Sequence, residues 1–208
     1  GRLLQLNSYE NRVFQMFLED GSAVVAKFYR PDRWTDAQIL EEHAFAGELA
    51  AHEIPVAAPL ALVPDTNSGS AERIALSGQT LGCWTSERGA AYRFGVTDKL
   101  AGRAPQLEDP ATLEWIGRFV GRLHAVGATA SFRHRQTLDV ATFGTGARDW
   151  LIDHDSVPPE ALDPWRTSVD AALGAVAEAF DRAGHPRSIR LHGDCHPGNI
   201  LWSGDGPH

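Results

Sequence analysis

Residues 192–199 read His-Gly-Asp-Cys-His-Pro-Gly-Asn, and they gather several reactive polar side chains into one short segment. His192, Asp194 and Asn199 keep the H-x-D-x-x-x-x-N spacing of the catalytic loops that carry out phosphoryl transfer. In that chemistry the aspartate accepts the proton of the attacking hydroxyl, and the asparagine binds a magnesium ion beside the phosphates. The spacing therefore predicts Asp194 as the catalytic base and Asn199 as a metal ligand.

Two simpler interpretations of residues 192–199 stay open. The Pro-Gly-Asn sequence is also typical of a turn between two short strands, in which case the aspartate would be incidental. The other interpretation is a zinc cluster, since all four of the polar residues His192, Asp194, Cys195 and His196 belong to types that bind zinc. Adjacent Cys and His side chains have poor geometry for a closed zinc site, however, and no second ligand pair is spaced nearby.

A lysine stands out in the N-terminal part of the chain. Of the 19 Lys and Arg residues only Lys27 and Lys99 are lysines, and Lys27 lies near the end of the apolar segment 23–29. Strand alternation places Lys27 on one face with Val25 and Tyr29. Taken alone, Lys27 is as well explained as an edge-strand lysine that discourages aggregation.

The next segment predicts a helix, because Thr35 and Gln38 have the spacing of a capping box. At about 100° per residue, Glu42 falls within the apolar stripe of a helix that runs to about residue 52. That stripe consists of Ile39, Ala46, Leu49 and Ala50, whereas Glu41 and Glu48 fall on the opposite, solvent side. An inward Glu42 near Lys27 matches the ion pair that orients ATP phosphates, although alone it would read as a half-exposed helix residue.

No G-x-x-x-x-G-K or G-x-G-x-x-G motif occurs in the chain, so neither a P-loop nor a Rossmann turn is available. The candidate for covering a nucleotide is residues 6–12. Their small polar side chains allow backbone N–H groups and the Ser8 hydroxyl to face phosphate. A plain turn explains these residues about as well.

The remaining patterns predict an α+β protein with two lobes. Residues 1–98 form the nucleotide-binding lobe, an antiparallel sheet with one helix: strands at 13–18 and 23–29, a polar loop at 64–72, and returning strands within 73–95. Residues 99–208 form a mainly helical lobe that carries the catalytic loop.

In this second lobe we expect two long helices that open with an Asp-Pro cap. One starts at Asp109-Pro110 and ends near Gly127, and the other starts at Asp163-Pro164 and ends at Gly184. Their buried stripes are Leu113, Ile116, Val120 and Leu123 in the first, and Val169, Leu173, Val176 and Phe180 in the second. Gly117 and Gly121 would permit close packing; a short helix is expected at 147–153, and short strands at 189–191 and 200–202.

Composition excludes several classes of protein. The net charge of −8 and pI near 5.5 oppose binding to nucleic acid, which needs a basic surface. No apolar run approaches the roughly 20 residues that span a bilayer. Cys83 and Cys195 form no disulfide framework, which predicts a cytoplasmic protein with reduced thiols. We also expect a monomer that does not bind membranes.

Four segments together resemble one family: residues 6–12, 25–34, 38–43 and 191–202. They are similar to the bacterial stress response kinase A family (YihE/RdoA), within the aminoglycoside phosphotransferase and choline kinase-like superfamily. The resemblance implies a bilobal protein-kinase-like fold, ATP with Mg²⁺ as cofactors, and phosphorylation of protein serine or threonine in a cytoplasmic stress response.

Carried over position by position, the resemblance makes Asp194 the catalytic base and Asn199 a magnesium ligand. It makes Ser8 a nucleotide-loop contact and Lys27 with Glu42 the pair that orients the phosphates. In the family, a second metal-binding aspartate follows the turn at 204–207, which is where this sequence stops. We therefore expect a fragment, trimmed at both ends, with an incomplete C-terminal lobe and little or no activity by itself.

Two other functions remain open. One is a small-molecule kinase that acts on an aminoglycoside, choline, another amino alcohol or a sugar, and the other is a nucleotide-binding module without catalysis. Residues 128–165 should face the phosphate acceptor. Their charges are mixed and do not choose between the acceptors: Arg133, His134, Arg135, Asp149, Asp153 and Asp155.

Overall fold

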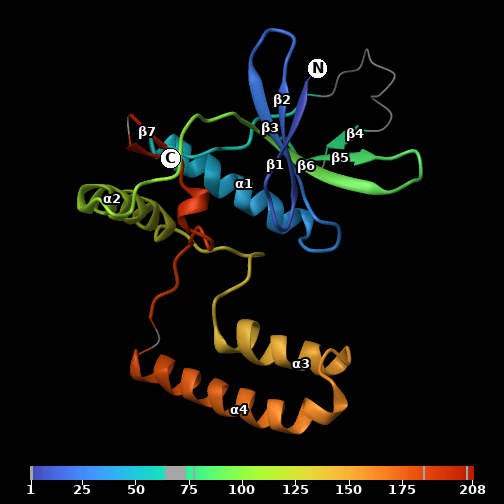
Figure 1. Cartoon of the computed structure of the whole chain (residues 1–208), viewed down its shortest axis with the longest axis vertical. Helices are drawn as coiled ribbons and strands as arrows, with labels where there is room; N and C mark the ends of the chain where they lie inside the picture. The colour runs from blue at the N-terminus through green and yellow to red at the C-terminus, as the bar shows by residue number, and fades with distance from the viewer. Residues whose placement is uncertain (1, 64–73, 77, 185, 205) are drawn as a thin grey trace. The chain divides into compact units, whose positions relative to one another are not determined.

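A computed structural model describes residues 2–63, 74–76, 78–184, 186–204 and 206–208. Contacts between residues divide the chain into two compact units. The first unit comprises Gly1–His134 and Arg190–His208, and the second comprises Arg135–Ile189 (Figure 1). The division into lobes at residue 98 stays a prediction, and the polar loop predicted at 64–72 lies outside the described residues.

The first unit contains a six-stranded antiparallel sheet with the order β1-β2-β3-β6-β5-β4 (Figure 1). The strands are β1 (Leu3–Leu6), β2 (Arg12–Phe17), β3 (Ala23–Phe28), β4 (Ile74–Leu76), β5 (Gly82–Thr85) and β6 (Ala91–Asp98). The predicted hairpin is confirmed, and so is the return of later strands to the same sheet. The sequence patterns do not predict β1, a short strand that pairs with β2 at the edge of the sheet.

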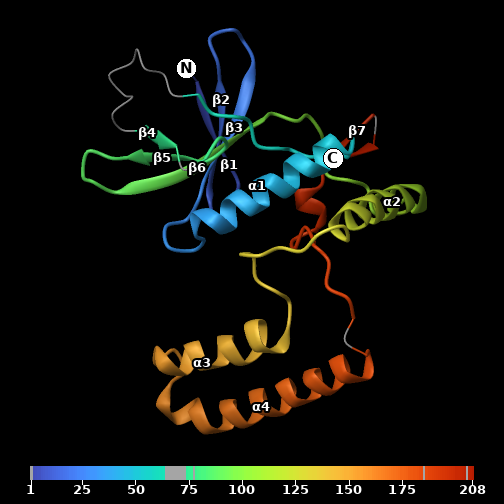
Figure 2. The ribbon, with the colours of Figure 1, turned by 180° about the vertical axis from the view of Figure 1, so that it is seen from behind.

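Helix α1 (Asp36–Ala51) begins at the predicted capping box. The Thr35 hydroxyl accepts a hydrogen bond from the Gln38 backbone N–H, and the Gln38 side chain accepts one from the Thr35 N–H. The helix lies beside the sheet in both ribbon views (Figure 2). Buried Ile39 packs with Tyr29 and Leu81 of the sheet region, which fixes the face of the sheet that α1 covers.

The predicted orientation of α1 needs a correction on one side. The buried residues are Ile39, His43, Phe45 and Leu49, whereas Ala50 is exposed. The carboxylates of Glu41 and Glu48, predicted to face solvent, instead bind later segments of the chain. The prediction was wrong because it assumed that other parts of the chain pack against one side of the helix only, whereas they contact two sides.

Helix α2 (Pro110–Gly127) has the predicted start, with the Asp109 carboxylate accepting a hydrogen bond from the Ala111 N–H. Its inner side joins α1 in the main apolar cluster, which consists of Phe45, Leu49, Ile54, Phe119, Leu123 and Val126. Two predictions were wrong. Leu113 is 50% exposed, and a Cβ added at Gly117 or Gly121 would meet nothing within 4 Å.

The second unit consists of a π-helical turn (Ala141–Thr145), helix α3 (Gly146–Asp153) and helix α4 (Pro159–Arg182). The predicted Asp-Pro cap of α4 was wrong, because Pro159 occupies the first turn and Pro164 lies inside the helix. Pro164 is the sixth residue of α4 and has no backbone N–H, so the helix lacks the hydrogen bond that this position would otherwise donate. Gly184 follows the helix with φ +72°, as expected of a residue that ends it.

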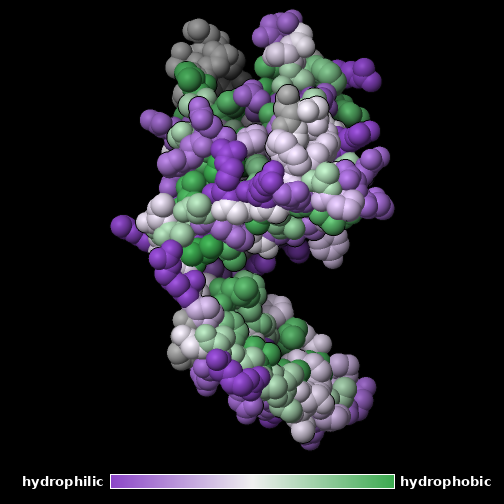
Figure 3. Space-filling view, turned by 90° about the vertical axis from the view of Figure 1, so that its left-hand side faces the viewer, coloured by the Kyte–Doolittle hydropathy of each residue, from purple (hydrophilic) through white to green (hydrophobic). Residues whose placement is uncertain are grey.

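Apolar side chains are visible on the surface of this second unit (Figure 3). The large exposed ones are Leu138, Phe143, Trp150 and Val176. Val176 belongs to the stripe predicted to be buried, and none of the described residues of α4 is buried. Two helices alone therefore do not enclose a core here.

The C-terminal segment returns to the first unit. Residues 189–191 form no strand, Pro197–Asn199 form a 3₁₀ turn, and β7 (Trp202–Ser203) pairs with β8 (Gly206–Pro207). The strand predicted at 200–202 thus begins two residues late.

Among the helices in the described part of the chain, none is long and apolar enough to cross a membrane.

Candidate functional site

Lys27 and Glu42 form an ion pair between strand β3 and helix α1. The Lys27 Nζ lies 3.1 Å from the Glu42 Oε1, and each side chain is 36% exposed. The Lys27 ammonium also stands 4.8 Å from the centroid of the Tyr29 ring, which favours a cation above its face. The fold therefore joins the two side chains and leaves both accessible to a ligand.

A polar network lies beside this pair, and the sequence patterns did not reveal it. The Tyr29 hydroxyl is 2.6 Å from the Nε2 atom of His43, and the His43 Nδ1 atom is 2.9 Å from the Thr80 hydroxyl. Burial lowers the pKa of His43, although the Glu42 charge opposes the shift. Gly95 borders the ring so closely that an added Cβ would stand 3.0 Å from the His43 Cε1. A neutral imidazole is thus held rigidly next to Glu42.

The 192–199 loop holds Asp194 and Asn199 together. The Asn199 Nδ2 donates to the Asp194 Oδ2 at 3.0 Å and to the Asp194 backbone oxygen at 2.9 Å. The Asp194 N–H donates to the His192 Nδ1 at 3.2 Å. Gly193 has φ +81°, a conformation that favours glycine. These bonds fix the carboxylate while its side chain stays 75% exposed.

Electrostatics connect this loop with the ion pair. Protein packed around the His192 ring lowers its pKa by desolvation, even though the residue keeps exposed surface. The charges of Asp194 and Glu42 act in the opposite direction, and that of Lys27 acts with burial. His192 therefore lies within electrostatic range of all three charged groups, so the first unit gathers them into one region.

Ser8 lies in the turn between β1 and β2. Its hydroxyl accepts a hydrogen bond from the Asn11 N–H at 3.3 Å, and the Asn11 side-chain oxygen accepts one from the Arg30 N–H at 3.3 Å. The hydroxyl thus closes the turn that residues 6–12 form. Within the described part of the chain, Ser8 has no hydrogen bond to the other four predicted site residues, and its nucleotide contact stays a prediction.

The oxygen atoms of the loop suit a hard cation. Because the Asn199 amide donates to the Asp194 carboxylate, its own carbonyl oxygen points away from that bond. Amide and carboxylate oxygens are the ligands that Mg²⁺ prefers.

The zinc interpretation of the loop has less support, since the described residues contain no group of three or more His, Cys, Asp or Glu placed to hold a metal. The strand expected at 189–191 is absent, so a turn between two strands does not describe the loop.

Comparison with known proteins gives the chain a family. The family model described as "Phosphotransferase enzyme family" (APH) matches residues 2–208. Stress response kinase A of Salmonella choleraesuis is 39% identical over 207 residues, which are 99% of this chain and 56% of that protein. Serine/threonine protein kinase RdoA of Salmonella typhimurium matches with the same identity and coverage. The chain spans about half the length of these curated relatives.

A solved structure supports the kinase-like fold. Amicoumacin kinase hAmiN, in complex with AMP-PNP, Ca²⁺ and Ami, superposes with a TM-score of 0.63 at 19% identity. The superposition covers 99% of this chain and 56% of that one. The predicted α+β class, with an N-terminal antiparallel sheet and a helical remainder, is confirmed.

Proposed function

The chain belongs to the phosphotransferase enzyme family, and from this premise we propose that it is the ATP-binding and catalytic part of a protein serine/threonine kinase. The proposed reaction transfers the γ-phosphate of ATP to a serine or threonine hydroxyl. The names of its relatives, stress response kinase A and serine/threonine protein kinase RdoA, support this choice of acceptor. A cytoplasmic place in a stress response is part of the same proposal.

The observation that carries the proposal is the Lys27–Glu42 ion pair in the same unit as the 192–199 loop. A lysine whose ammonium group is held by a glutamate is suited to bind phosphate oxygens, because its positive charge is already in a fixed position. Ser8 and the turn around it would cover the phosphates. Mg²⁺, bound together with ATP, would supply positive charge that offsets the charge developing on the phosphates.

Asp194 would accept the proton of the attacking hydroxyl. Its carboxylate suits this role because it is open to an incoming acceptor, while the Asn199 amide and the His192 imidazole fix the segment around it. The side-chain oxygen of Asn199 would hold the metal. Asn199 would therefore position the base and bind the cation at once.

A small-molecule kinase is the alternative within the same fold. The second unit has a polar hollow between α3 and α4 that is lined by Arg148, Asp149, Ile152, Asp153, Arg166 and Asp170. Within it Arg148 binds both Asp149 and Asp170. Its carboxylates suit a cationic alcohol, whereas its arginines oppose one, so a protein acceptor remains our first choice.

Because little or no activity is expected of residues 1–208 by themselves, the test uses the full-length protein and measures transfer of label from [γ-³²P]ATP, with Mg²⁺, to a panel of acceptors. The panel holds a serine- and threonine-rich protein, choline, ethanolamine and an aminoglycoside. We expect label on the protein at serine and threonine. Label on a small alcohol alone would contradict the protein-kinase assignment, and Mg²⁺-independent nucleotide binding without any transfer would favour a non-catalytic module.

A further inference from the structure

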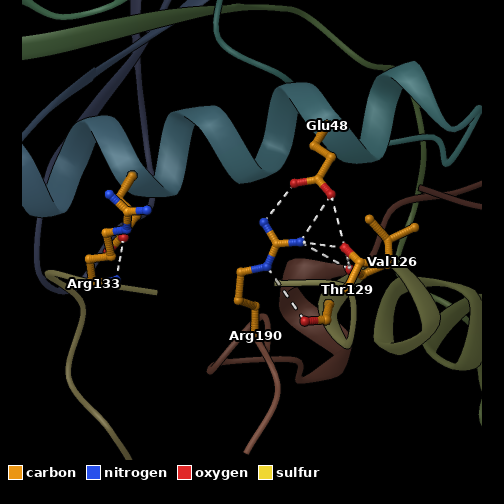
Figure 4. A network of polar contacts seen from close by, with 7 residues as sticks. Glu48, Val126, Thr129, Arg133 and Arg190 are labelled. Carbon is orange, nitrogen blue, oxygen red and sulfur yellow. Dashed lines mark hydrogen bonds and ion pairs between the residues drawn. The ribbon is translucent and has the colours of Figure 1, made fainter. Parts of the chain in front are cut away.

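Arg190 and Glu48 form a second ion pair, between the start of the catalytic segment and helix α1. The Arg190 side chain is 8% exposed, and it contacts both carboxylate oxygens of Glu48, at 2.6 and 3.0 Å. Figure 4 shows the two side chains pointing toward one another. The Glu48 side chain is 34% exposed. A two-pronged contact of this kind fixes the direction as well as the distance between its partners.

Arg190 makes further hydrogen bonds besides those to Glu48. Its guanidinium donates to the Val126 backbone oxygen at 3.0 Å and to the Thr129 hydroxyl at 3.2 Å (Figure 4). The Phe45 ring centroid lies 4.4 Å from the guanidinium carbon. The hydrogen bonds from Arg190 hold the pKa of Glu48 below its usual value. Arg190 therefore binds α1, the end of α2 and the residues after α2 simultaneously.

The Arg190–Glu48 pair lies on a second face of α1, whose residues contact later segments of the chain. Gln38, Glu41, Phe45 and Glu48 recur at steps of three and four residues and so share one helix face. At the other end of this face, Glu41 accepts hydrogen bonds from the backbone N–H groups of Arg133 and His134, and the Gln38 amide donates to the His134 oxygen at 3.0 Å. The helix is held at both ends.

We propose that Arg190 is a positioning residue that couples helix α1 to the catalytic loop. Glu48 lies six residues after Glu42 on one rigid helix, and Arg190 lies two residues before His192. A movement of α1 as one rigid body that separated Glu42 from Lys27 would also displace Glu48 from Arg190. The pair thereby links the phosphate-orienting end of the site to the Asp194 end.

The chemistry of the pair favours this role over a purely stabilising one. A buried ion pair is often no more stabilising than well-packed apolar residues of similar volume, because desolvation offsets the attraction. What the ion pair provides is a single defined geometry. A defined geometry matters where two parts of a site must keep a fixed position relative to each other. This argument rests on the function proposed above.

The first test does not depend on catalysis. Glu48→Gln leaves the Arg190 cation without its counter-charge, and Glu114→Gln makes the same change in the exposed Arg118–Glu114 pair on α2. We expect amide hydrogen exchange of residues 192–199 to be about tenfold faster in Glu48→Gln and unchanged in Glu114→Gln. Unchanged exchange in both variants would overturn the coupling.

The second test asks whether the coupling serves transfer. In the full-length protein, Glu42→Gln is combined with the wild-type residue at position 190 and with Arg190→Gln. Arg190→Lys serves as a variant that keeps the charge but not the two-pronged contact. We expect Glu42→Gln to lower the rate of transfer at least about tenfold in wild type and less than about threefold in Arg190→Gln. Additive losses, or an Arg190→Lys chain that behaves as wild type, would overturn the positioning role.

The two tests separate the failure of each proposal. If the full-length wild-type protein binds ATP but transfers no phosphate to any acceptor, the proposed function fails. The exchange experiment still decides whether Arg190 couples the helix to the loop. If wild type is active and exchange does not respond to Glu48→Gln, the coupling alone is wrong.

Discussion

Lys27 and Glu42 meet at 3.1 Å although Glu42 lies fifteen positions later in the chain. Both side chains are about one-third exposed, and an ion pair in such a setting stabilises a protein by only about 0–1 kcal/mol. The pair is thus a poor source of stability. In the proposed function, its value lies in pointing the Lys27 ammonium group toward the ATP phosphates.

Replacing Lys27 should therefore affect activity far more than folding. We expect Lys27→Met to lower ATP-dependent transfer by about 10²–10³-fold and to change the free energy of unfolding by less than about 1 kcal/mol. The matched control is Lys99→Met, at the other lysine of the chain, which is exposed. Steady-state kinetics and urea unfolding measure both effects, and equal losses of activity in the two variants would contradict the role of Lys27.

His43 should make stability depend on pH. Burial lowers its pKa in the folded state below the ordinary value of 6.5, so the unfolded state binds more protons between the two values. The free energy of unfolding should then rise with pH through this window, by at most about 1.4 kcal/mol per pH unit for one group, and level off above 6.5. His43→Gln should flatten the slope in urea titrations between pH 5 and pH 7, whereas an unaltered slope would exclude His43 as its source.

Two glycines of α2 should respond in opposite ways to alanine. At Gly127 an added Cβ would collide with the Arg190 backbone oxygen, whereas at Gly117 it would meet nothing. We expect Gly127→Ala to destabilise the chain by at least about 1–3 kcal/mol and Gly117→Ala to stabilise it by about 0.5–1 kcal/mol. Denaturant midpoints compare the two, and similar midpoints would mean that residue 190 does not dock closely on α2.

Asn199 should set the metal requirement. Asn199→Ala removes the proposed metal ligand and the amide that holds Asp194, so we expect the Mg²⁺ concentration for half-maximal transfer to rise about 10–100-fold. Asn199→Asp keeps an oxygen ligand and serves as the control, with a smaller rise. If Asn199→Ala keeps the wild-type Mg²⁺ dependence, Asn199 does not bind the metal.

Local patterns in the sequence were sufficient for most of the elements that position the site. The strand around Lys27, the Thr35 capping box and the Asp109 cap each depend on neighbouring residues, and all three are confirmed. The start of α4 was missed because an Asp-Pro cap at residue 163 and a Pro-Pro start at residue 158 look equally good locally.

Long-range contacts were beyond those patterns. Glu48 was predicted to face solvent because its partner, Arg190, lies 142 residues later in the chain. His43 directly follows Glu42, yet its partners Tyr29 and Thr80 come from separate parts of the chain. Such pairs form only when distant segments meet, and no spacing rule within a helix contains that information.

The most direct measurement of the central claim uses Asp194→Asn with labelled ATP. The substitution keeps the shape of the side chain and removes the proton acceptor, so nucleotide and Mg²⁺ binding should persist. We predict that ATP affinity stays within about threefold of wild type, while label transfer falls by at least about 10²-fold. Transfer at the wild-type rate by Asp194→Asn would contradict the assignment of residues 192–199 as a catalytic loop.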